Sequence, residues 1–187
     1  MKHIDILINF EREINKLDDS LNKPVTDDSL YWINQAITKF VKLRFNGDFV
    51  HGTSYEQNEK RTRDLINLFK EQTYDVVSMI QSSSEDYNAY DLRYPIDFLY
   101  TLNEDVVISD LNGDHRKDTH VFECTADSFM HRINNSLTDF HYRRHRARPL
   151  RIRTTTGCRL FTDKKYNIMS YTLGYLKTPS EVTLDNP

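Results

Sequence analysis

The spacing of apolar residues changes near residue 73, and no other feature of this 187-residue sequence constrains the fold as strongly. Before this point, apolar residues recur at the spacing of an amphipathic helix. After it, short apolar runs alternate with turn residues, which is typical of antiparallel strands. The sequence therefore predicts an α+β fold: an N-terminal antiparallel helical bundle, then a mostly antiparallel β-sheet region with one further helix and an extended C-terminal tail.

Three helices are predicted before the change. The first covers residues 4–17, and Asn22-Lys23-Pro24 separates it from the second, which Thr26 caps and Asn46-Gly47 ends. A capping-box pattern opens the third, over residues 54–69. We expect the second helix to bury one apolar stripe, formed by Leu30, Ile33, Ala36, Ile37, Phe40 and Val41.

The second half of the chain alternates predicted strands with less regular segments. A strand over residues 74–80 precedes a polar run, 81–91, that we interpret as a mobile loop, and Pro95 begins a short helix. Asn112-Gly113 favours a hairpin between strands 105–109 and 119–124. A helix follows from Ala126 to about Leu137. The last predicted strands form an antiparallel meander: 150–155, 158–162 and 166–176.

We expect a helical bundle over residues 1–72, a sheet region over 73–176 and a tail over 177–187 that breaks away at Pro179, together making one compact unit. No apolar run approaches the roughly 20 residues that span a bilayer. The charged first helix is not typical of a secretory signal. Cys124 and Cys158 are the only cysteines, so we expect free thiols in a reducing compartment.

No recognisable catalytic, cofactor or metal motif is present, so we predict a protein that is not an enzyme and holds no cofactor. Asp110 to Asp114 resembles the start of a calcium loop. His115 stands where such a loop needs glycine, and Val121 where it needs glutamate. An ordinary hairpin turn fits better. The histidines of the second half lack zinc-site spacing: His115, His120, His131, His141 and His145.

The charge distribution is strongly asymmetric. Residues 141–162, which we call the basic window, hold seven arginines and no acid. Because the whole chain carries −3, the remainder carries −10. Arginine binds phosphates and carboxylates alike, so the window contacts a nucleic-acid backbone, docks on acidic neighbours such as copies of this chain, or is a solvated loop. We favour docking. The candidate contact residues are Arg143, Arg144, Arg146, Arg148, Arg151 and Arg153.

Several stretches resemble proteins of phage particles. The capped helix Thr26–Ile37, with its Asn34-Gln35-Ala36 step, resembles the N-terminal helices of tailed-phage head-to-tail connectors. Residues 91–99, 159–163 and 173–179 are similar to virion ring proteins of crAss-like phages. The resemblance implies a ring, usually twelve-fold, beneath the portal. The arginine stretch is not part of it.

The expected function is therefore a structural virion protein that forms a ring in the phage neck and lines the DNA passage. Its implied partners are copies of itself, the portal protein, and tail or other neck ring proteins, with non-specific contact to phage DNA and none to a membrane. Assembly would take place in the host cytoplasm. The alternative is a soluble nucleic-acid-binding accessory protein that uses the arginine stretch at 143–153.

Overall fold

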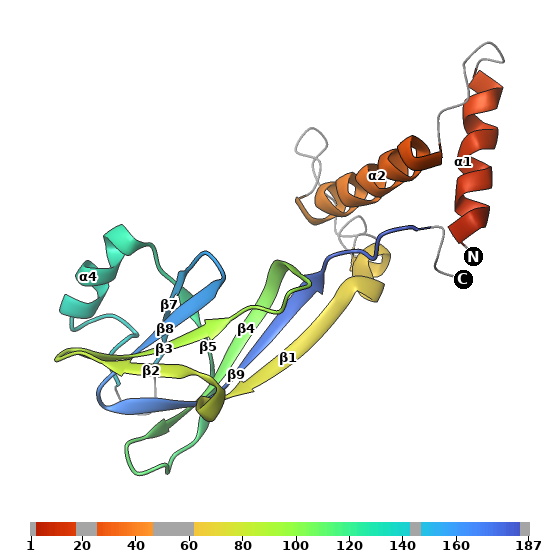
Figure 1. Ribbon diagram of the computed structural model, residues 1–187. Coiled ribbons are helices and arrows are strands. Elements are labelled where there is room, and N and C mark those ends of the chain that lie inside the picture. Colours follow the sequence, from red (N-terminus) through yellow and green to blue (C-terminus); the bar gives the residue numbers. More distant parts are fainter. Residues whose placement is uncertain (1–2, 18–25, 47–61, 143–146, 184–187) are drawn as a thin grey trace. The chain divides into compact units, whose positions relative to one another are not determined.

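A computed structural model describes residues 3–17, 26–46, 62–142 and 147–183 (Figure 1). The fold is α+β, as predicted, with helices and two antiparallel-rich sheets. The chain divides into two compact units. The helical unit comprises Met1–Leu68 and Thr178–Pro187, and the β unit comprises Phe69–Lys177. The tail segment thus groups with the helices.

The helical unit contains α1 (His3–Leu17) and α2 (Thr26–Asn46), close to the predicted limits. Asp27 and Asp28 lie in the first turn of α2, where their negative charges interact favourably with the positive end of the helix dipole. The buried centre of the unit is formed by Leu7, Ile33 and Val182, with Ile6, Phe10, Leu30 and Ile37 packed around it. The tail therefore completes the helical core, and the prediction that it breaks away at Pro179 was wrong.

Two helix predictions need correction. Ala36 and Phe40 are exposed rather than part of the buried stripe of α2. In the third predicted helix, residues 54–61 lie outside the described residues, 62–65 are helical, and a 3-10 turn, η1, covers Ile66–Leu68. Phe69 already begins a strand, because its backbone pairs with Leu176. The three-helix bundle stays a prediction.

The β unit holds two sheets. In the first, strands run in the order β1 (Phe69–Asp75), β9 (Tyr166–Lys177), β4 (Phe98–Asp110), β5 (Lys117–His120). In the second, the order is β2 (Ile80–Ser83), β3 (Tyr87–Arg93), β8 (Gly157–Asp163), β7 (Leu150–Arg153), β6 (Phe122–Glu123). Among these pairs, only β6 with β7 is parallel.

Alternating side chains of the second sheet fill two separate cores. Tyr90 of β3 and Leu160 of β8 join β4 and β9 residues such as Ile108 in the core between the sheets. Their neighbours Ala89 and Phe161 point to the other face, because successive strand residues alternate. Helix α4 (Ala126–Asn134) covers that face with Phe129 and Ile133. The β unit is therefore layered as sheet, sheet and helix (Figure 1).

The hairpin after β4 is present, but the predicted strand 119–124 is divided between β5 of the first sheet and β6 of the second. A helix lies at the place of the later predicted one. Strands β4 and β5 pair antiparallel, and α4 begins at Ala126 as predicted but ends at Asn134. At the hairpin turn, the Asp110 carboxylate accepts the backbone N–H groups of Asn112 (3.1 Å) and Asp114 (2.9 Å). Gly113 adopts φ 83°, a conformation that suits glycine.

Four predictions in the β unit were wrong: one strand, one loop, one short helix and the final meander. The strand over 74–80 is broken by η2 (Val76–Ser78), and the polar run 81–91 is the β2–β3 hairpin. Polar residues suit β2 because it is an exposed edge strand held by backbone pairing. Pro95 starts a turn instead of a helix, and its carbonyl oxygen accepts the Phe98 N–H at 3.0 Å. The predicted meander is not continuous, because β9 pairs with β1 and β4 in the first sheet instead of with β8 in the second.

Candidate functional site

The site predicted from the sequence centres on the basic window. Arg143, Arg144 and Arg146 fall in residues 143–146, here called the arginine segment, which lie outside the described residues. The residues on either side are well anchored. The Arg148 N–H donates to the Asp139 carbonyl at 2.8 Å, and Ala147 and Pro149 are buried. The arginine segment is therefore attached to a fixed base.

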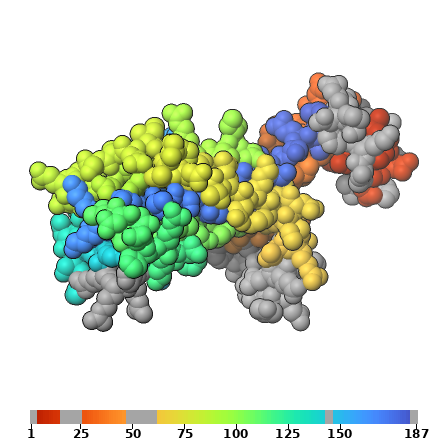
Figure 2. Space-filling model, turned by 90° about the horizontal axis from the view of Figure 1, so that it is seen from below, coloured from red at the N-terminus to blue at the C-terminus, as the bar shows by residue number. Residues whose placement is uncertain are grey.

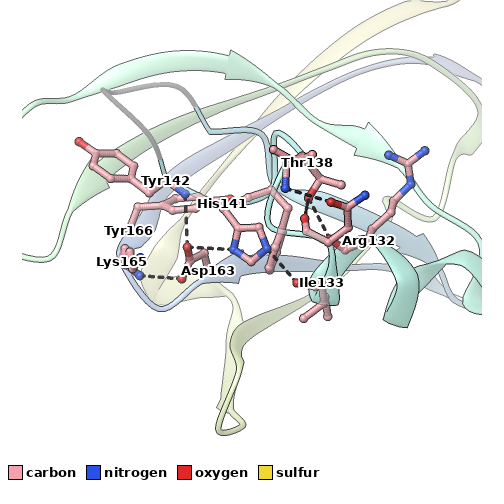
Figure 3. A network of polar contacts seen from close by, with 11 residues as sticks. Arg132, Ile133, Thr138, His141, Tyr142, Asp163, Lys165 and Tyr166 are labelled. Atoms are coloured by element: carbon pink, nitrogen blue, oxygen red, sulfur yellow. Dashed lines mark hydrogen bonds and ion pairs between the residues drawn. The ribbon is translucent and has the colours of Figure 1, made fainter.

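A polar network around Asp163, at the end of β8, holds the other side of this base (Figure 3). Its carboxylate accepts the Tyr142 N–H at 3.3 Å and lies 3.4 Å from His141 Nδ1. The Nε2 atom of His141 is 2.8 Å from the Ile133 carbonyl oxygen at the end of α4. The Tyr166 hydroxyl donates to the Phe140 carbonyl at 3.1 Å. Strand β8, β9 and α4 thus converge where the arginine segment begins.

The other three candidate arginines differ in environment. Arg148 is exposed, with its Nε 3.9 Å from Asp139 Oδ2. Arg151, on β7, is 2% exposed; its guanidinium lies 2.5 Å from Glu104 Oε2 and 2.9 Å from Glu123 Oε1. Arg153 is exposed and lies 3.2 Å from Glu123. The structure therefore places Arg151 in the interior, so the six candidate arginines do not form one surface.

Acids of the same chain compensate much of the basic window. Besides these pairs, Arg159 contacts Asp91 with two nitrogens, at 2.5 and 2.8 Å. Docking on acidic neighbours, which we favour from the sequence, would balance the arginines with carboxylates of other copies. For Arg148, Arg151, Arg153 and Arg159, however, the paired carboxylates come from the subunit itself.

The polar interior around Arg151 is structural in character. The Tyr171 hydroxyl donates to Glu104 Oε1 at 2.5 Å, and burial raises the pKa of this phenol. Burial also raises the pKa of the Cys158 thiol to about 12, so the reactive thiolate is disfavoured. Both described cysteines are free and buried. Nothing in this cluster supplies an activated nucleophile.

A cleft of 440 Å³ lies beside the base of the arginine segment. On the face shown in Figure 2, the green residues of the β4–β5 hairpin border the cyan residues that follow α4. Asp105 and His120 pair within the cleft, which mixes acidic and basic side chains. Across the described ranges, no three His, Cys, Asp or Glu side chains are grouped so that they could hold a metal ion.

Sequence reasoning missed a second apolar stripe on α2. Trp32, Ala36, Phe40 and Leu43 follow one another at intervals of three or four residues, so they share one helix face. All four are exposed, Trp32 by 60%. The guanidinium of Arg44 lies 5.1 Å from the centre of the Phe40 ring. A helical projection would have separated this exposed stripe from the buried one, which runs through Ile33 and Val41.

Comparison with models of known protein families and with curated proteins finds no match for this sequence. In the part of the chain that the structure describes, no helix combines the length and the apolar character needed to cross a membrane.

Proposed function

We propose that this chain is a structural subunit that assembles with copies of itself into a ring in the neck of a tailed phage, between portal and tail. The exposed stripe of α2 carries the proposal. Contiguous apolar surface of this kind marks protein–protein contact sites. Helix α2 already packs a separate apolar face into its own core, so this stripe is available for a partner.

The arginine segment is assigned to the DNA passage. Asp139 and Asp163 anchor the described residues on either side of the segment, and the segment itself contains three closely spaced arginines. Since intrachain acids balance the rest of the basic window, docking on neighbours is no longer required to explain its charge. A ring of such segments offers sequence-independent contacts to phosphates, which suits DNA that must slide past.

Assembly through α2 is tested by native mass. We expect the wild-type chain to form a ring in mass photometry and the Trp32→Asp/Leu43→Asp variant to remain a folded monomer. The matched control is Gln35→Asp, which adds a charge to an exposed polar position of the same helix. Rings that survive the double change would contradict the role of the stripe.

The arginine segment is tested separately. Changing Arg143, Arg144 and Arg146 together to Gln should leave rings intact and weaken duplex DNA binding. The salt dependence of binding should also decrease, by roughly one unit of slope for each phosphate that an arginine no longer neutralises. Failed assembly would restore the docking interpretation. A wild-type chain that is monomeric and binds duplex DNA tightly would instead favour the nucleic-acid-binding accessory protein.

A further inference from the structure

In the helical unit, Asn34, Leu7 and Ile33 together hold Val182 of the tail, and we call this site on α1 and α2 the groove. The carboxamide of Asn34, on α2, pairs with both main-chain groups of one tail residue. Its Oδ1 accepts the Val182 N–H at 2.9 Å, and its Nδ2 donates to the Val182 carbonyl at 3.2 Å. The Val182 side chain fills the cluster with Leu7 and Ile33. The Asn34 side chain thus binds the backbone of residue 182, and the apolar cluster packs against its valine side chain.

The tail segment, residues 178–183, behaves as a ligand of this groove. It has no helix or strand, and within this described part of the tail Val182 alone is buried. The tail segment follows directly on β9, the last strand of the β unit. Asn34 of the groove lies 148 positions before Val182 in the chain. The recognised segment and its groove are therefore joined only by a long path through the other unit.

We propose that the tail segment of one copy occupies the α1–α2 groove of the next copy in the assembled ring. Exchange of an identical element reproduces every contact that the segment makes within one chain, so it adds no new interface requirement. Each copy offers one groove and one tail segment. Such a contact is heterologous, and repeated contacts of this type form a ring where the rotation between copies closes and an open filament where it does not. The inference rests on the proposed self-assembly, but it involves a different surface from the exposed stripe of α2.

Two complementary variants test this exchange. Val182→Asp damages the tail segment and leaves the groove intact. Asn34→Asp removes the amide donor to the Val182 carbonyl and leaves the tail segment intact. Ser180→Asp, which places the same charge at an exposed tail position, is the control. Exchange predicts that each variant alone is monomeric, that the mixture forms a one-to-one pair and nothing larger, and that the control assembles like the wild type.

Other outcomes separate the two proposals. Rings formed by both variants, or variants that stay monomeric when mixed, would overturn exchange while wild-type rings keep the proposed function. A wild-type chain that stays monomeric would overturn both. As a second measurement that needs no loss of folding, Ile33→Cys/Val182→Cys can be oxidised and run on a non-reducing gel. Exchange predicts covalent multimers, and a cross-linked band of single-chain mass only would overturn it.

Discussion

The guanidinium of Arg151 and the carboxylate of Glu104 meet at 2.5 Å across the two sheets of the β unit, one from β7 and the other from β4. Arg151 is almost fully buried, and Glu104 also accepts the hydroxyl of Tyr171 from β9. Burying two charges is costly unless each has a partner. The pair therefore links the two sheets, in addition to the apolar core between them.

Removing the arginine from this pair should strongly destabilise the fold. We expect Arg151→Met to lower the free energy of unfolding in urea by about 3–5 kcal/mol, because the largely buried Glu104 carboxylate loses its opposite charge. Adding Glu104→Gln should recover part of the loss. Arg153→Met is the control, since Arg153 is exposed and its loss should change stability by about 1 kcal/mol or less. Equal effects of the two single changes would contradict the assignment.

Two glycines in the sheets should differ in their tolerance of a methyl group. A Cβ on Gly157 would overlap the backbone of Leu92 and Arg93, which pairs with β8 and cannot move without breaking the sheet. A Cβ on Gly174 would overlap the exposed side chain of Asn103, which can rotate. We expect Gly157→Ala to lower the thermal unfolding midpoint well below that of Gly174→Ala. Similar midpoints would show that the β3–β8 pairing relaxes easily.

Stability should fall in alkaline solution. Burial raises the pKa of the Cys158 thiol from 9.0 to about 12 and that of the Tyr74 phenol from 10.0 to about 12. The unfolded chain therefore releases these protons first, so the stability is fully present below pH 9 and is lost as the pH rises towards 12. Urea unfolding across this range provides the measurement. Cys158→Ala should flatten the decline, and an unchanged slope would exclude the thiol as a cause.

The β2–β3 hairpin should resist hydrogen exchange even in a single subunit. Strand β3 is paired on both sides, with β2 and with β8, and its Tyr90 is buried in the core between the sheets. Backbone amides of β3 are therefore expected to exchange slowly, and those of residues 85 and 86 in the turn quickly. Fast exchange throughout residues 81–91 would instead support the mobile loop expected from the polar sequence.

Local sequence signals predicted α1, α2, α4 and the β4–β5 hairpin, because each has its own caps, apolar stripe or turn residues. It failed where a tertiary partner decides the structure. Strand β2 is polar and exposed, and only its pairing with β3 makes it a strand. Likewise, the position of β9 depends on distant strands.

The candidate site was predicted in part. The sequence located the basic window, but not the interior position of Arg151, since its partners Glu104 and Glu123 come from other strands. Equally, no local pattern links Asn34 to Val182, because the contact joins residues that are 148 positions apart in the chain.

The place of β9 in the first sheet also bears on how the chain acquires its structure during synthesis. Strand β9 lies between β1 and β4, yet it leaves the ribosome after both. Until it emerges, the nascent chain has two strands that cannot pair with their native neighbour, and α1 and α2 lack the valine that completes their core. Folding of both units is therefore completed only after residues 166–182 have been translated. Until then, the open edges of β1 and β4 need protection from other chains.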